Sequence, residues 1–112
     1  MNLVESEVGD VAILAIEGDV DAGSAPDVEQ RLRELMQSAK YKLVLDLEGV
    51  PYVSSAFLRV VLAAARDLRR QGGDLRLANP QYPVRSVFDL AGFSGLLKIY
   101  DDLPSAISSY RI

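Results

Sequence analysis

Apolar and polar residues alternate in two short segments near the start of the chain, residues 3–8 and 11–17. A period of two is typical of β-strands, because successive side chains of a strand point to opposite faces of a sheet. The second segment, VAILAIE, is the more apolar of the two. Gly9 and Asp10 stand between the segments as a two-residue turn, so the pattern predicts a β-hairpin.

After the hairpin and a loop at 18–23, strand-like and helix-spaced apolar segments alternate to the end of the chain. The first helix is expected to begin at Ser24, which resembles a capping box with Asp27. Gly92 is expected to terminate the third helix as its C′ residue. The inward positions of the first helix are predicted to be Val28, Leu32, Leu35 and Ala39. Further strands are predicted at 42–47, 74–78 and 96–100, and further helices at 54–71, 83–91 and 102–110.

The order of the predicted elements indicates an α/β fold. Strand–helix–strand connections are right-handed and join parallel strands, so an N-terminal hairpin followed by alternating helices and strands gives one mixed β-sheet with helices packed on it. A length of 112 residues suits a single domain spanning 1–112. In such sheets, functional groups gather where strands end and helices begin. Here those places hold Asp19, Asp21, Ser54, Ser55 and the segment 79–83.

Composition removes several classes of function. The chain has no Cys and no His, so no Ser–His or Cys–His pair can form. We therefore expect no catalytic residues, no metal site and no cofactor. The net charge of −4 disfavours nucleic-acid binding, which normally needs a basic excess. We see no signal peptide, and the longest mostly apolar stretch, 57–65, is too short to insert into a membrane. The expected location is the cytoplasm.

The second predicted helix carries the most informative surface. Its helical spacing places Ser55, Arg59, Arg66 and Arg70 on one stripe. This stripe is either a docking surface or a solvated helix face whose arginines suit the helix dipole. Ser54 and Ser55 likewise have two interpretations. Either serine can simply cap the helix, or a phosphoserine can be tolerated at a helix N-terminus.

Two other candidates for chemistry are weaker. Asp19 and Asp21 lie two residues apart in a loop, which is too few ligands for a magnesium cage, and we expect them to serve turn formation and solvation. The segment 92–95, GFSG, lacks the lysine of a phosphate-binding loop and follows a helix instead of preceding one. Neither segment predicts a catalytic site.

Three strings of the sequence resemble the STAS domain family. The most specific is LDLEGVPYVSSAFLRVVLAA, which resembles the family's central signature. The other two are VAILAIEGDVD near the N-terminus and AGFSGLLKIYDD near the C-terminus. Together they cover nearly the whole chain and are most similar to the anti-sigma factor antagonists within the family.

The resemblance implies a function and a site. In antagonists of this type, a serine kinase that is itself the anti-sigma factor phosphorylates the serine that corresponds to Ser55. The family's loop aspartate corresponds to Asp21. The implied partners are therefore this kinase, which has the ATPase fold, and a matching phosphatase; the ATP belongs to the kinase. The residues that the resemblance assigns to partner binding are Asp21, Ser54, Ser55, Ala56, Phe57 and Arg59.

The sequence departs from the family signature at the start of the second helix. Ser54 replaces a frequent aspartate, Ala56 replaces a second hydroxyl residue, and Phe57 replaces a glycine. We expect the Phe57 ring to be partly exposed beside Ser55, where it could extend an apolar contact with a partner. The alternative function is an accessory subunit of a transporter that binds an ATPase without phosphorylation. An enzyme acting through Asp21 and Ser55 is disfavoured by the absence of His and Cys.

Overall fold

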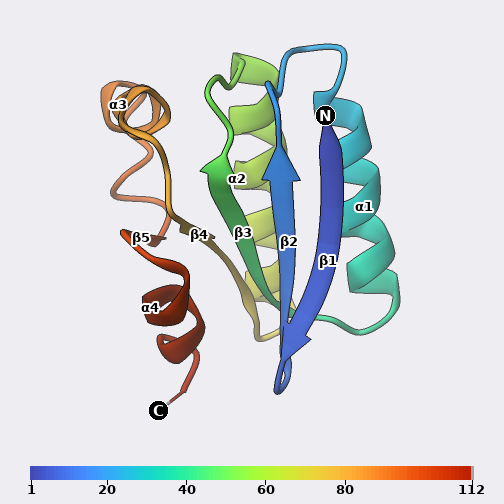
Figure 1. Ribbon diagram of the computed structural model, residues 1–112. Helices are drawn as coiled ribbons and strands as arrows, with labels where there is room; N and C mark the ends of the chain where they lie inside the picture. The colour runs from blue at the N-terminus through green and yellow to red at the C-terminus, as the bar shows by residue number, and fades with distance from the viewer. Residues whose placement is uncertain (112) are drawn as a thin grey trace.

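The computed structural model describes residues 1–111 and contains one five-stranded sheet (Figure 1). The strands lie side by side in the order β1-β2-β3-β4-β5. β1 and β2 pair antiparallel, whereas each later pair of neighbours is parallel. The mixed sheet with an N-terminal hairpin is therefore confirmed. The strands are β1 (Asn2–Val8), β2 (Val11–Glu17), β3 (Lys42–Gly49), β4 (Asp74–Ala78) and β5 (Ile99–Tyr100).

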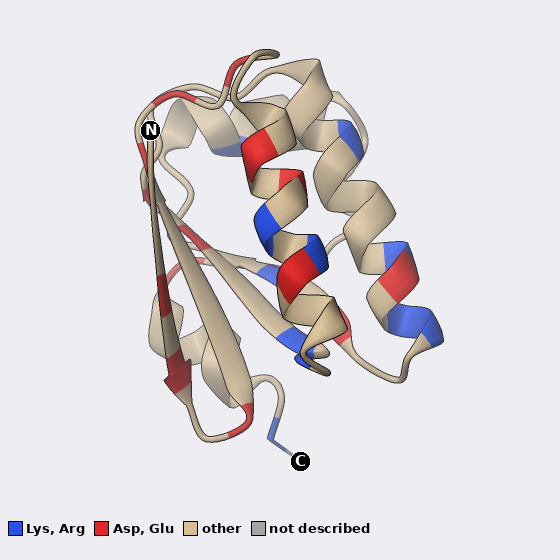
Figure 2. Cartoon of the chain, turned by 90° about the vertical axis from the view of Figure 1, so that its right-hand side faces the viewer, with Lys and Arg blue, Asp and Glu red and all other residues tan. Residues whose placement is uncertain are grey.

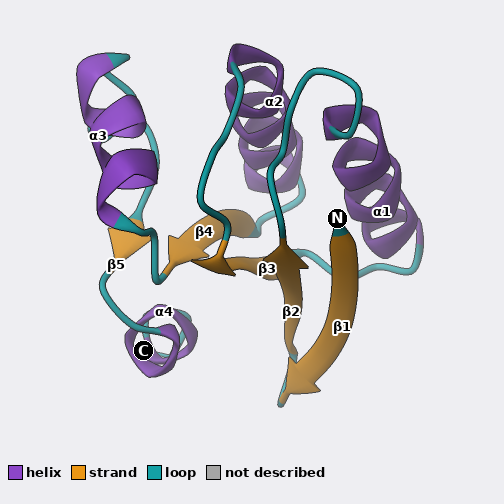
Figure 3. Ribbon diagram, turned by 45° about the horizontal axis from the view of Figure 1, so that its top comes forward, coloured by secondary structure: helices purple, strands orange, loops and turns teal. Residues whose placement is uncertain are grey.

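Helices cover both faces of the sheet. Figure 3 shows the short C-terminal helix on one face and the other helices on the opposite face. No helix within residues 1–111 is long and apolar enough to cross a membrane. The C-terminal helix is α4 (Leu103–Ser108), and the helices of the opposite face are α1 (Ala25–Gln37), α2 (Ser55–Arg70) and α3 (Tyr82–Leu90).

The hairpin forms as its turn chemistry predicts. Gly9 has φ +60°, and glycine at the first central position with positive φ is what a type II′ turn requires. The ladder between β1 and β2 runs without a shift from Asn2 opposite Glu17 to Val8 opposite Val11. This register places Leu14 and Ile16 on the face that packs under α1 and α2. The hairpin thus brings the apolar segment 11–17 into the centre of the fold.

The main core lies between the sheet and α1, α2 and α3. β2 and β3 contribute residues that point to this face, and α2 contributes one continuous stripe of its surface. A smaller core lies on the opposite face, where α4 packs Ala106 against Val11, Ile13, Val44 and Ala78. The buried stripe of α2 consists of Phe57, Leu58, Val61, Ala64, Ala65 and Leu68.

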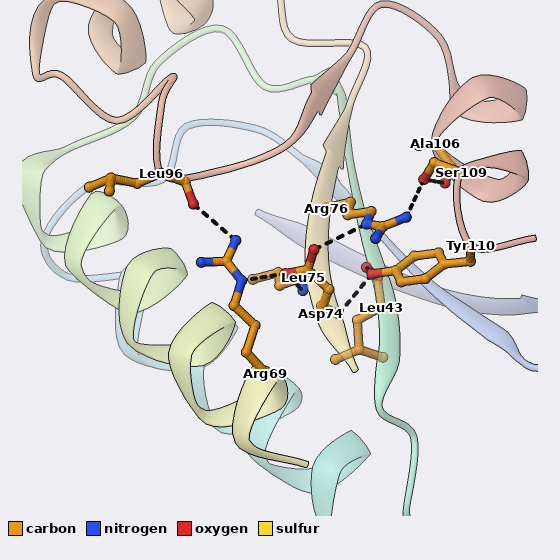
Figure 4. A network of polar contacts seen from close by, with 9 residues as sticks. All are labelled: Leu43, Arg69, Asp74, Leu75, Arg76, Leu96, Ala106, Ser109 and Tyr110. Carbon is orange, nitrogen blue, oxygen red and sulfur yellow. Dashed lines mark hydrogen bonds and ion pairs between the residues drawn. The ribbon is translucent and has the colours of Figure 1, made fainter. Parts of the chain in front are cut away.

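A polar network that we call the C-terminal clamp fastens the end of the chain to the sheet (Figure 4). The Asp74 carboxylate, only 5% exposed, pairs with Arg69 at 2.9 Å and with Arg76 at 3.1 Å. Tyr110 Oη lies 2.7 and 2.8 Å from the carbonyl oxygens of Leu43 and Asp74, which share its single hydroxyl proton. Arg76 also stacks 4.0 Å above the Tyr110 ring. The clamp satisfies the buried carboxylate and holds the segment after α4 against β3 and β4.

Three local predictions were wrong. The capping box is absent, because Ser24 makes no side-chain bond to the start of α1. Ala39 lies beyond α1 with φ 60°, so it does not extend the helix face. The strand expected at 96–100 shrinks to two residues, because the amides of Leu96 and Leu97 donate to the Phe93 carbonyl in tight turns. Gly92, with φ +77°, does follow the C-cap Ala91 of α3 as predicted.

Candidate functional site

The candidate site lies at the carboxyl ends of β2 and β3, the upper edge of the sheet in Figure 1. Two loops leave this edge, one leading to α1 and one to α2. They are joined by a parallel bridge between Val20 and Val53. Val20 N donates to Tyr52 O and Ser54 N donates to Val20 O, both at 2.9 Å. Asp21 and Ser54 are thus held on neighbouring backbone segments, and Asp21 lies near the start of α2.

Ser54 and Ser55 have different roles in the structure. Ser54 is the N-cap of α2, and its Oγ accepts a hydrogen bond from Phe57 N at 3.3 Å. Ser55 is the first residue of the helix and is exposed. Within residues 1–111 its hydroxyl makes no hydrogen bond to another group. Of the two serines, only Ser55 therefore presents a hydroxyl that is free of a structural task.

Asp21 organises the loop that leads to α1. Its amide donates to Ser24 Oγ at 3.0 Å, while Ser24 N donates to Asp21 Oδ1 at 2.8 Å. The Ala25 amide also donates to Asp21 O at 3.0 Å. These reciprocal bonds are those of a capping box in which Asp21, three residues upstream, takes the place predicted for Ser24. The bonds from the Ser24 amide and hydroxyl lower the pKa of the Asp21 carboxyl below its usual value.

Phe57 contradicts the expectation of a partly exposed ring. Its exposed fraction is 0%, and it belongs to the main core. Positions 57, 61, 64 and 68 recur at helical spacing, so the ring lies on the same stripe as Val61, Ala64 and Leu68. Helical spacing in the sequence predicts a buried side made of Leu58, Val61, Leu62, Ala65 and Leu68. The observed buried face is rotated from it toward Phe57, and Leu62 is only half-buried. Phe57 supports the first turn of α2 from beneath and offers no atoms to the surface.

The arginines of α2 differ in how they are engaged. Arg70 pairs with Asp67 at 3.1 Å. Arg59 and Arg66 are exposed and form no ion pair within the described part of the chain. Arg59 follows Ser55 by one helical turn, the spacing at which side chains on one face can meet. The predicted stripe therefore exists, and its end nearest Ser55 carries an uncommitted positive charge.

Two exposed tyrosines near the site were not anticipated. Tyr52 is 53% exposed two residues before the N-cap, and Tyr82 is 84% exposed at the first residue of α3. Gln81 Nε2 donates to Glu48 O at 2.7 Å, so the start of α3 is tied to the end of β3, just before the loop that carries Tyr52. Single tyrosines between loop residues give no periodic signal, which is why pattern reasoning missed them. They add aromatic surface to an edge that otherwise presents hydroxyls and carboxylates.

The site offers surfaces for binding. Asp21 Oδ1 already accepts hydrogen bonds from the amide and the hydroxyl of Ser24. Among residues 1–111, no group of three or more carboxylates is arranged to hold a metal ion. The geometry presents one free hydroxyl at a helix N-terminus, one free guanidinium a turn later and a rigid pair of loops beside them.

Comparison with known proteins matches this arrangement to one family. The sequence model of the STAS domain matches residues 3–106. BtrV of Bordetella bronchiseptica is 31% identical over 111 residues, which cover 99% of this chain and 96% of that protein. The anti-sigma-B factor antagonist of Bacillus subtilis is 30% identical over 84 residues, covering 75% and 76% of the two chains.

Solved structures agree with the fold. An anti-sigma factor antagonist from Mycobacterium paratuberculosis superposes with a TM-score of 0.90 at 22% identity, covering 99% of this chain and 94% of that one. The Bacillus cell fate determinant SpoIIAA, solved in its phosphorylated form, gives a TM-score of 0.75 at 20% identity and covers 98% and 100% of the two chains. At these identities the likeness concerns the fold alone.

Proposed function

Because the chain belongs to the STAS domain family, we propose that it is an anti-sigma factor antagonist, a protein-binding switch that a serine kinase turns off by phosphorylating Ser55. The kinase is the anti-sigma factor itself, which releases its sigma factor when it binds the unmodified antagonist. A matching phosphatase restores the free serine. This role places the protein in the cytoplasm, and the ATP is bound by the kinase.

The observation that carries the proposal is that the Ser54 hydroxyl caps α2, whereas the Ser55 hydroxyl takes part in no hydrogen bond of the described residues. Ser54 Oγ already accepts the Phe57 amide, so phosphate on Ser54 would disturb the helix cap. Ser55 is exposed and its hydroxyl is uncommitted. A kinase can therefore reach and modify Ser55 without breaking a bond of the fold.

The charges around Ser55 explain why phosphate would act on binding and not on folding. A phosphoserine adds about −1.5 to −2 charges. At the first turn of a helix this charge favours the fold by roughly 0.3–1 kcal/mol, and Arg59 can pair with it. Burying the same charge in an interface costs desolvation energy.

The test measures phosphate by intact mass after incubation with the cognate kinase and ATP. The unmodified protein and Ser54→Ala should each gain one phosphate, whereas Ser55→Ala should gain none. Affinity for the kinase should fall on phosphorylation while the melting temperature changes little. Undiminished labelling of Ser55→Ala overturns the assignment. Stable co-purification with a membrane ATPase complex, insensitive to Ser55→Ala, would instead favour the role of a transporter subunit.

A further inference from the structure

The outer edge of β1 is an unpaired strand edge. β1 stands first in the sheet order, and seven of its residues pair with β2 on the inner side. A two-residue turn makes Val8 and Val11 a hydrogen-bonded pair, and such pairs alternate along an antiparallel ladder. The backbone N–H and C=O groups of Leu3, Glu5 and Glu7 therefore point away from β2. The opposite edge of the sheet, β5, has only two residues.

The usual protection of an edge strand is weak here. Edge strands are normally kept apart by proline, by bulges or by charged side chains. β1 contains no proline, and its ladder has no register shift. Its two carboxylates are already engaged on the helix side, Glu7 with Lys40 at 2.7 Å and Glu5 with Arg31 at 3.9 Å.

The surroundings of this edge leave room for another strand. Figure 2 looks at this side of the molecule, where β1 and α1 face the viewer and no other element lies outside them. The surface between β1 and α1 is hollowed, and Glu5, Glu7, Arg31, Leu35 and Lys40 are among the residues that line it. On the opposite face of the strand, Val4 is 53% exposed and Val8 is 41% exposed. A strand added at this edge would cover both valines and part of the hollow.

We propose that the occupant of this edge is β1 of a second copy of the chain, paired antiparallel about a two-fold axis at Ser6. In this register Val4 of each copy lies opposite Val8 of the other, and such apolar cross-strand pairs stabilise sheets. Glu5 of each copy lies opposite Glu7 of the other. Within each copy, Glu5 pairs with Arg31 and Glu7 pairs with Lys40. The negative charges that meet across the two-fold axis are therefore each neutralised by a cation of their own copy. The dimer joins the two sheets into one by strand addition.

Sedimentation equilibrium of the full chain over a range of concentrations tests the proposal with a matched pair of variants. Glu5→Pro removes an outward N–H that the β1–β2 ladder does not use, whereas Glu5→Ala removes the same carboxylate and keeps the N–H. Wild type and Glu5→Ala should both form dimers. Glu5→Pro should raise the dimer dissociation constant about tenfold or more, because the two-fold axis removes two hydrogen bonds. Circular dichroism checks that each variant is folded.

A second variant covers the case in which Glu5→Pro does not fold. Val4→Asp places a carboxylate on the exposed face opposite Val8 of the other copy, and it should weaken the dimer without touching the core. A wild type that stays monomeric at all concentrations overturns the proposal and leaves the edge to a strand of another protein. A dimer that survives both substitutions overturns it as well, because the contact then lies elsewhere. Neither result depends on phosphorylation of Ser55, so the test is independent of the proposed function.

Discussion

Replacing Phe57 by alanine should destabilise the domain strongly, although family resemblance suggested a tolerant position. The ring is 0% exposed and lies at the start of the buried stripe of α2. Truncating a fully buried phenylalanine to alanine costs about 3–5 kcal/mol, the sum of lost apolar transfer energy and the cavity left behind. Domains of this size have unfolding free energies of about 5–15 kcal/mol, so the loss is a large fraction of the total. Phe57→Gly should lose about 1 kcal/mol more through helix propensity.

Urea unfolding followed by circular dichroism measures this loss directly, as a fall in the midpoint at an unchanged slope. A thermal scan should show a melting temperature lower by roughly 12–20 °C, since about 1 kcal/mol corresponds to about 4 °C in a domain near this length. Phe57→Leu is the matched control, because it keeps most of the apolar volume and should cost less than about 1.5 kcal/mol. Tyr52→Ala, at an aromatic residue that is 53% exposed, should change stability little.

The reasoning is refuted if Phe57→Ala loses less than about 1 kcal/mol, because no buried phenylalanine in a packed core behaves in this way. It is also refuted if the folded variant loses affinity for the kinase while its stability is unchanged. That result would place the ring on the surface, as the resemblance had suggested.

Three further predictions concern the cap and the C-terminal clamp. Ser54→Ala should lower the unfolding free energy by about 1 kcal/mol, because it removes the N-cap of α2, whereas Ser55→Ala should be nearly neutral in the same urea titration. Burial and, to a smaller extent, the Asp74 carboxylate raise the pKa of Tyr110 above its ordinary value of 10.0. The contribution of the protonated Tyr110 hydroxyl to stability is therefore fully present below pH 10. Above pH 10 the free energy of unfolding should fall by about 1.4 kcal/mol per pH unit, and Tyr110→Phe should lack this slope. Asp74→Ala should cost about 3–5 kcal/mol, because it leaves the largely buried Arg76 without its carboxylate; equal stability of variant and wild type in urea would contradict the clamp.

The regular part of the fold could be predicted because its signal is local. In β2 the apolar run and the flanking turn residues specify a strand, and in α2 the helical spacing of apolar positions specifies a helix. The prediction failed at 96–100, where the residues have the composition of a strand. There the Phe93 carbonyl captures the amides of Leu96 and Leu97, which a longer β5 would use. The acceptor lies before the segment, so the composition of 96–100 alone does not reveal this turn.

The site was predicted in outline and not in detail. The sequence placed Asp21, Ser54 and Ser55 at one edge of the sheet, and the bridge between Val20 and Val53 confirms this. Helix-cap chemistry alone could not rank the two serines, because either can serve as an N-cap, and only the family resemblance singled out Ser55. Sequence reasoning also misplaced Phe57. A small rotation of α2 about its axis moves a residue at the margin of the buried stripe from the surface into the core. Such rotations are set by packing against the sheet, which a single sequence does not show.

The agreement between strand order and chain order affects how the domain is assembled during synthesis. Each strand pairs with the strand made just before it, so a chain leaving the ribosome N-terminus first can build the sheet outward from the hairpin without waiting for distant segments. The exception is Tyr110, whose hydroxyl reaches back 67 positions to Leu43. The face that α4 covers, including Val11 and Val44, stays open until that tyrosine has emerged. A stalled chain that lacks α4 and Tyr110 would thus have a nearly complete sheet with one apolar face exposed to solvent. Chaperones and proteases recognise such exposed apolar surface.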